Sequence, residues 1–104
     1  MNLKNNFTFD SAAEKLRKNL PSNVSVILRS NLLDSKKKWF DIDKDMFVGV
    51  RVTFYGHAPI IDTYVPNILA RSFSSGLISG IFHNKARNEF KKQIATIIIS
   101  EFYE

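Results

Sequence analysis

The sequence predicts an α+β fold with an N-terminal helix, an antiparallel sheet of three to four strands, and two C-terminal helices packed on one face of that sheet. Three observations lead to this prediction. The chain begins with a capped amphipathic segment, and its middle contains short segments that alternate apolar and polar residues. After Pro66 the apolar residues recur at helical spacing. A chain of 104 residues, 44% of them hydrophobic, is long enough for one core.

Composition and charge define the class of protein. We treat residues 1–104 as a single domain, with residues 1–8 as a candidate disordered arm. The chain has no cysteine, and its first residues contain no apolar run typical of a signal peptide, so we expect a cytoplasmic location. Fifteen Lys and Arg against ten Asp and Glu give a formal net charge of +5. Such an excess keeps a small protein soluble, and it also suits a polyanionic partner.

Residues 10–20 are predicted to form the first helix. Ser11 and Glu14 have the spacing of a capping box, in which each side chain satisfies a backbone donor of the other residue. The apolar residues at helical spacing are Ala13, Leu16 and Leu20. Pro21 cannot continue the helix, so the helix should end before it.

The segments between this helix and Pro66 have strand character. The alternating segments are NVSVILRS (23–30), FVGVRVTFY (47–55) and IIDTYV (60–65), and KWFDI (38–42) is a candidate short strand. The polar stretch from Asp34 to Lys38 suits a hairpin loop, and GHAP (56–59) suits a turn.

A helix over residues 68–82, with Asn67 as its N-cap, is predicted after Pro66. Its small residues recur at every fourth position: Ser72, Gly76 and Gly80. Because residues four apart share a helix face, we expect this small face to let another element approach closely. The alternative is a helix that ends near Ser74 and is followed by a glycine-containing loop. The apolar interval is too short to span a bilayer.

Residues 84–104 are predicted to form the last helix, with Asn84 at its start. The apolar stripe consists of Ala86, Phe90, Ile94, Ile97 and Phe102. The β-branched run ATIII (95–99) lowers helix propensity, and a strand there is the alternative.

The sequence contains no strong catalytic, cofactor or metal motif. Asp41, Asp43 and Asp45 alternate like the first ligands of a calcium loop, but Met46 and Val52 occupy the positions that need glycine and glutamate. The two histidines lack metal-ligand spacing, and neither a nucleophile elbow nor a phosphate-binding glycine loop is present. We therefore predict no catalytic residue, no cofactor and no metal, and we favour a non-enzymatic role.

The first functional prediction is a small soluble interaction protein that associates with itself or with another protein. The last helix has apolar residues beyond its core stripe, namely Ala95, Ile99 and Tyr103. Exposed apolar surface of this kind is typical of partner contacts. We expect no membrane partner.

The alternative prediction is sequence-tolerant RNA or DNA binding through the basic face of the last helix. The basic residues are Lys85, Arg87, Lys91 and Lys92. The segment HNKARNEFKK resembles the lysine-rich, alanine-containing start of the last helix in double-stranded RNA-binding domains, which implies contacts with phosphates. The consecutive lysines usual before the alanine are replaced by Asn84 and Lys85, and the helix predicted before this segment departs from that pattern. The chain is therefore not assigned to that family.

Overall fold

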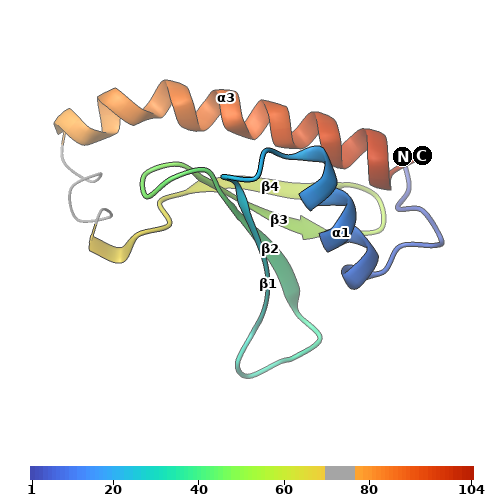
Figure 1. Ribbon diagram of the computed structural model, residues 1–104. Helices are drawn as coiled ribbons and strands as arrows, with labels where there is room; N and C mark the ends of the chain where they lie inside the picture. Colours follow the sequence, from blue (N-terminus) through green and yellow to red (C-terminus); the bar gives the residue numbers. More distant parts are fainter. Residues whose placement is uncertain (70–76) are drawn as a thin grey trace.

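The computed structural model describes residues 1–69 and 77–104, of which residues 77–82 are described by their backbone alone. In these described residues, two helices precede and follow a meander of four strands along the chain. The order is α1 (Phe9–Asn19), β1 (Ser25–Ser30), β2 (Lys38–Asp43), β3 (Gly49–Phe54), β4 (Pro59–Tyr64) and α3 (Leu77–Phe102). The strands pair antiparallel in the order β1-β2-β3-β4 (Figure 1). This arrangement confirms the predicted α+β class and the antiparallel sheet.

The core lies between the sheet and the helices. Leu28, Phe40, Val52 and Ile61 lie in register across the four strands, and all belong to the core or pack against it. The buried apolar residues of the helices are Ala12, Ala13 and Leu16 of α1 and Phe90, Ile94, Ile98 and Phe102 of α3. Val26, Ile42 and Val50 lie two residues along from this row and belong to the same core face. The strand residues between the two rows point to the opposite face, because side chains alternate along a strand.

Helix α1 begins one residue earlier than predicted and has a different cap. Thr8 is the N-cap, and its Oγ1 accepts a hydrogen bond of 3.2 Å from the backbone N–H of Ser11. The predicted pairing of Ser11 with Glu14 does not form the cap, because Thr8, also a favoured N-cap residue, lies three residues earlier and caps the helix. At the other end, Leu20 has extended backbone angles, as the following proline requires.

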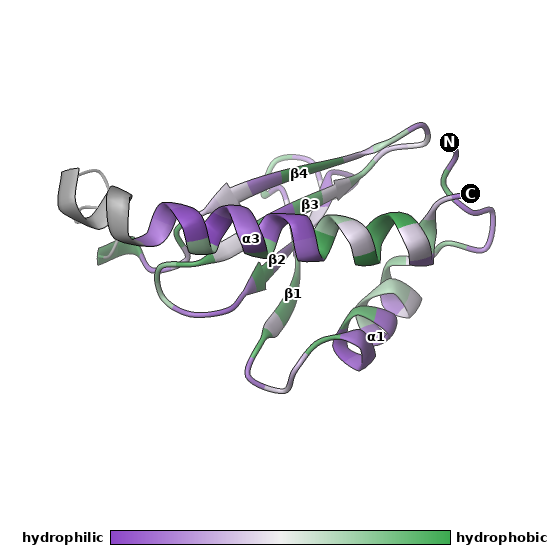
Figure 2. Ribbon diagram, turned by 90° about the horizontal axis from the view of Figure 1, so that it is seen from above, coloured by the Kyte–Doolittle hydropathy of each residue, from purple (hydrophilic) through white to green (hydrophobic). Residues whose placement is uncertain are grey.

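The prediction of two C-terminal helices is wrong for the described residues. One helix, α3, runs for 26 residues from Leu77 to Phe102, through the break predicted at His83 and Asn84. Asn84 and Lys85 are exposed, so their polarity fits a solvated helix face and does not require a helix end. Figure 2 shows α3 as hydrophilic in its middle and largely hydrophobic toward its C-terminus.

The alternative of a strand at residues 95–99 is also wrong. This segment is helical, and Ile94 and Ile98, one turn apart, are both fully buried. Packing of this ridge on the sheet outweighs the β-propensity of the isoleucines. Ile97, which was predicted for the stripe, is only partly buried.

The small-residue face falls largely outside the described residues. Ser72 and Gly76 lie outside the described residues, and so does the alternative helix end predicted near Ser74. Gly80 lies in α3.

The first residues of the chain pair with its last residues, as Figure 1 shows by the adjacent termini. The backbones of Asn2 and Glu104 exchange two hydrogen bonds of 2.9 Å, and the N–H of Leu3 donates to the carbonyl of Gly56 at 2.8 Å. The ring of Phe7 lies 4.7 Å from that of Phe54. The segment considered as a candidate arm is thus held by backbone and aromatic contacts.

Candidate functional site

The sheet face turned away from the core carries a row of register partners across the four strands, and three of the four are charged. Ile27, Asp41, Arg51 and Asp62 are register partners in this row. Asp41 is only 2% exposed, and its carboxylate accepts hydrogen bonds of 2.7 Å from the Nε atoms of both Arg29 and Arg51. A buried charge is tolerated when it is paired in this way, so the two arginines are held by one carboxylate.

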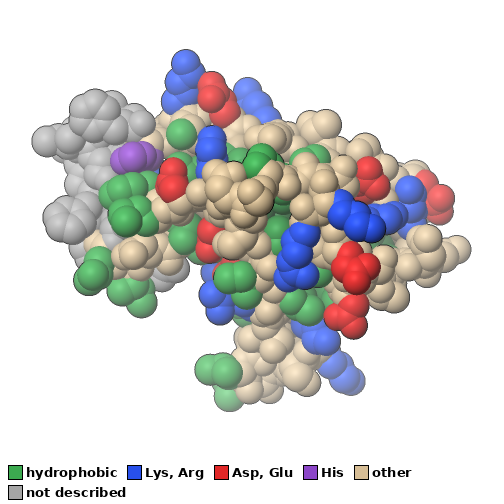
Figure 3. Space-filling model, viewed as in Figure 1, with side chains coloured by type: hydrophobic (Ala, Val, Ile, Leu, Met, Phe, Trp, Pro, Cys, Tyr) green, Lys and Arg blue, Asp and Glu red, His purple; other side chains and the backbone are tan. Residues whose placement is uncertain are grey.

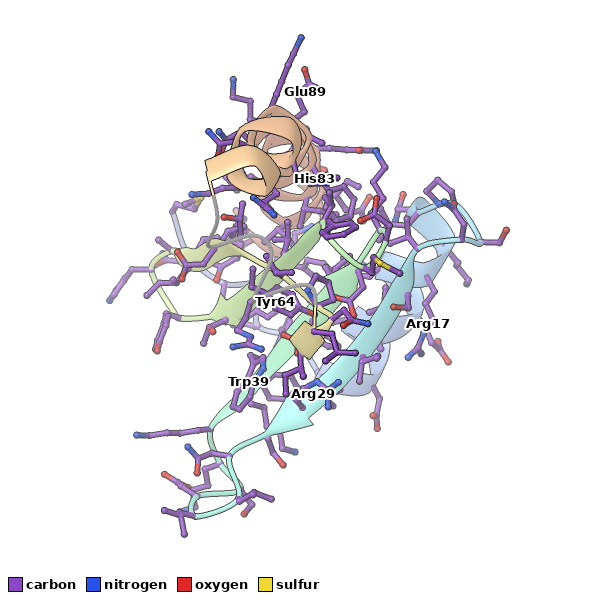
Figure 4. All side chains as sticks on the ribbon, turned by 90° about the vertical axis from the view of Figure 1, so that its left-hand side faces the viewer. Arg17, Arg29, Trp39, Tyr64, His83 and Glu89 are labelled. Atoms are coloured by element: carbon purple, nitrogen blue, oxygen red, sulfur yellow. The ribbon has the colours of Figure 1, made fainter. Side chains whose placement is uncertain are left out.

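Aromatic rings flank the second of these arginines. The Arg51 guanidinium carbon lies 4.8 Å from the ring centre of Tyr64 and 5.5 Å from that of Trp39, within cation–π range. The Tyr64 hydroxyl donates a hydrogen bond to the Asp43 carboxylate. Burial raises the pKa of both Asp43 and Tyr64 above their ordinary values. The network fixes the surroundings of Trp39, which lies between Tyr64 and the projecting loop of the β1–β2 hairpin (Figure 4).

A hollow of about 360 Å³ lies next to Trp39, at the end of the sheet from which that hairpin projects. We call it the lysine–aromatic pocket. Its lining residues are Lys36, Lys37, Lys38, Phe9, Trp39, Phe54, Tyr55, Asn31 and Thr53. None of these described residues is acidic. The pocket therefore combines an aromatic lining with three positive charges.

The loop of the hairpin, residues 31–37, is held by two hydrogen bonds between side chains and its own backbone, of a kind typical of turns. The Asn31 side chain accepts a hydrogen bond of 2.8 Å from the N–H of Leu33, and the Asp34 side chain accepts one of 3.1 Å from the N–H of Lys36. These contacts leave Leu32 at 103% and Leu33 at 99% exposure. Hydrophobic and basic side chains are visible together at the projecting end of the molecule (Figure 3).

The residues predicted for self-association do not share one exposed apolar surface. Tyr103 is 4% exposed, and its hydroxyl donates a hydrogen bond of 2.7 Å to the carbonyl of Tyr55. Ala95 is half-buried. Ile99, at 44% exposure, is the one large apolar side chain of the three that reaches solvent.

The basic residues of the last helix are also separated by the structure. Arg87 is 9% exposed, and its Nε donates a hydrogen bond of 2.9 Å to the carbonyl of Phe47. Its guanidinium therefore belongs to the packing of α3 on the β2–β3 connection. Lys85, Lys91 and Lys92 are exposed, and Lys85 lies 4.0 Å from Glu89.

The alternating aspartates are each engaged separately. Asp41 pairs with the two arginines, Asp43 accepts from Tyr64, and Asp45 accepts from the backbone N–H groups of residues 47 and 48 at 2.7 and 2.8 Å. His83 stacks on Phe47 with ring centres 4.3 Å apart. Within residues 1–69 and 77–104, no group of three His, Cys, Asp or Glu side chains is arranged to hold a metal ion.

Sequence reasoning missed the lysine–aromatic pocket and the leucines beside it. Within NLLDSKKKWF (31–40), the stretch from Asp34 to Lys38 was interpreted as a hairpin loop and KWFDI (38–42) as a candidate short strand, and no binding role was considered. Two signals were available in it: adjacent leucines in a predicted loop, and a lysine run followed directly by tryptophan. The tertiary packing that brings Phe9 of α1 beside Phe54 and Tyr55 has no signal in the local sequence.

Comparison with models of protein families, with curated proteins and with solved structures found no match to this chain. In the described part of the chain, no helix is both long and apolar enough to cross a membrane.

Proposed function

We propose that this chain is a small non-enzymatic binding protein, and that the lysine–aromatic pocket binds an anionic group attached to an aromatic or apolar body. The observation that carries this proposal is the composition of the pocket, three lysines around four aromatic residues in a hollow of about 360 Å³. Ligand sites of this size typically combine an apolar lining with a few polar groups that fix orientation.

The charges of the pocket support an anionic ligand. None of Lys36, Lys37 and Lys38 forms an ion pair with a described residue, so their charges are not neutralised locally. Lys38 lies with its Nζ 5.4 Å from the ring centre of Phe9, which places positive charge directly over the aromatic lining. Lysine binds phosphate as a point charge, and a ring or chain attached to that phosphate would pack against the aromatic residues.

The pocket is a better candidate than either surface predicted on the last helix. The self-association surface retains one well-exposed apolar side chain, Ile99, and a single such residue is ordinary on a protein surface. The basic surface predicted on the last helix does not include Arg87, because the Arg87 side chain is buried and hydrogen-bonded to the carbonyl of Phe47. Nucleic acid remains one source of the proposed ligand chemistry, because each nucleotide joins a phosphate to a planar base.

The chain contains one tryptophan, Trp39, and it lines the pocket, so its fluorescence reports directly on binding. The probes are adenosine monophosphate and a short-chain phosphatidic acid below its micellar concentration. We expect a saturable change in fluorescence with at least one probe, weakened by salt because the contacts are charged. If neither probe produces a saturable change in fluorescence up to about 1 mM, the proposal is overturned.

A pair of matched variants locates the binding. The pocket variant replaces Lys36, Lys37 and Lys38 with Gln, and the helix variant replaces Lys85, Lys91 and Lys92 with Gln. Both remove three exposed or half-exposed charges, so they alter the net charge equally. The pocket variant should lose at least about tenfold in affinity while the helix variant stays within about threefold. Equal losses would show that net charge alone attracts the probe.

A further inference from the structure

In contrast to the expectation of no membrane partner from the sequence, we propose that the loop of the β1–β2 hairpin docks this protein on an anionic membrane surface. Leu32 and Leu33 enter the apolar side of the lipid interface, and the lysine–aromatic pocket lies against the phosphates of the headgroups. This inference rests on the proposed function, since the headgroup is the anionic ligand of the pocket.

The exposure of the two leucines indicates that the partner of this loop offers apolar material. Adjacent leucines at 103% and 99% exposure are held outward by the side-chain hydrogen bonds of Asn31 and Asp34 to the loop backbone. Apolar surface gains free energy when it leaves water, so a partner of this loop is expected to offer apolar material. A nucleic-acid backbone offers phosphate and sugar instead, which favours lipid over nucleic acid for this surface.

The narrow shape of the hairpin tip favours a lipid surface over a folded protein partner. The hairpin projects away from the body of the fold, and its tip is the end of the molecule farthest from α3 (Figure 1). Two leucines on a narrow tip cannot provide the roughly 800 Å² per partner of a standard protein interface. A lipid surface has no such requirement, because side chains insert one by one into a fluid interface.

The positive charge of the loop favours an anionic lipid surface. Residues 31–38 contain three lysines and one aspartate, a net charge of +2. The backbone N–H of Lys37 donates to the Asp34 carbonyl at 3.0 Å, which turns the chain so that the lysines follow the leucines back toward the sheet. A basic residue near an anionic leaflet strengthens binding by about fivefold. Leucines at the tip and lysines behind them match the order of acyl chains and phosphates in a bilayer.

Sedimentation with lipid vesicles tests the proposal on the full chain. The vesicles contain phosphatidylcholine alone or phosphatidylcholine with phosphatidylserine. The test variant is Leu32→Ser with Leu33→Ser; both side chains are fully exposed, so the fold should persist, which circular dichroism checks. We expect the parent to bind the phosphatidylserine vesicles, and the leucine variant to bind them at least about tenfold more weakly.

The soluble probes separate the two proposals. The leucine variant should bind adenosine monophosphate or short-chain phosphatidic acid as the parent does, while the pocket variant loses soluble probe and vesicles together. The helix variant, with its altered lysines on the far side of the molecule, should keep both. Soluble binding without vesicle binding would overturn membrane docking and leave the proposed function intact. Failure of both soluble probes would overturn the proposed function itself.

A nucleic-acid outcome has its own signature. A single-stranded oligonucleotide that binds parent and leucine variant alike, and binds the parent more tightly than the vesicles do, would overturn membrane docking in favour of nucleic acid. Vesicle binding that is equal in parent and leucine variant would also overturn it, because the leucines would then contribute nothing.

Discussion

Replacing Asp41 with Asn tests whether one buried carboxylate organises the open face of the sheet. Asp41 is 2% exposed and accepts three hydrogen bonds, at 2.7 Å from Arg29 Nε, 2.7 Å from Arg51 Nε and 3.2 Å from Arg51 Nη2. Asparagine has nearly the same shape but only one acceptor oxygen. Its amide group would point hydrogen atoms at a guanidinium, which has only donors.

The magnitude follows from these contacts. Hydrogen bonds to charged groups contribute about 1.5–3 kcal/mol each, so two short contacts set an upper range of about 3–6 kcal/mol. The arginine side chains are 51% and 41% exposed, so water partly replaces the lost carboxylate. We therefore expect Asp41→Asn to lower the free energy of unfolding by about 2–3 kcal/mol.

Urea unfolding followed by Trp39 fluorescence measures this change, because Arg51 lies over the Trp39 ring. The matched control is Asp62→Asn, which removes the same charge from the same sheet face at an exposed position. The control should change the free energy of unfolding by no more than about 0.5 kcal/mol. If Asp41→Asn costs no more than the control, the buried carboxylate does not hold the two arginines and the reasoning is refuted.

Three further substitutions test separate parts of the fold. Gly49→Ala would place a methyl carbon 2.7 Å from a side-chain carbon of Tyr64, so thermal unfolding should show a loss of about 1–3 kcal/mol; a gain would mean that this side chain moves freely. Tyr103→Phe removes the hydroxyl that donates to the Tyr55 carbonyl, and urea unfolding should show a loss of about 0.5–1.5 kcal/mol. Because burial raises the pKa of Asp43, the folded chain binds this proton more tightly than the unfolded chain. Asp43→Asn should therefore stabilise near pH 7, by an amount that shrinks as the pH falls through the raised pKa; a pH-independent difference in unfolding free energy would contradict this.

The class of fold could be predicted because strand and helix periods depend on neighbouring residues. Val50 and Val52 alternate with Gly49 and Arg51, and this spacing alone places the two valines on one face. The N-terminal helix was predictable from its stripe, but its cap was not, because Thr8 and Ser11 are both suitable cap residues and the local sequence does not select between them.

The long last helix shows where local signals are insufficient. Asn84 can cap a helix or lie on its solvated side, and residues 95–99 suit a strand or a helix by composition. The burial of Ile94 and Ile98 against the sheet decides for a helix, and that contact joins residues far apart in the sequence.

The candidate site was beyond sequence reasoning for a similar reason. Lys36 to Trp39 are adjacent in the chain, but Phe9 and Tyr55 join them only through tertiary packing. The same limit affected the last helix, where Arg87 and Lys91 look equivalent in the sequence. Arg87 is buried and donates a hydrogen bond to the carbonyl of Phe47, and Lys91 is exposed.

The most direct test of the lysine–aromatic pocket is nitrogen-15 NMR of the chain during titration with short-chain phosphatidic acid. The chain has a single indole N–H, that of Trp39, so its cross-peak identifies the pocket without ambiguity. We predict that this peak and the amide peaks of residues 31–39 shift progressively and saturate, while those of Lys85, Lys91 and Lys92 stay in place. Shifts confined to α3, or no saturable shift at Trp39, would contradict the proposed binding site.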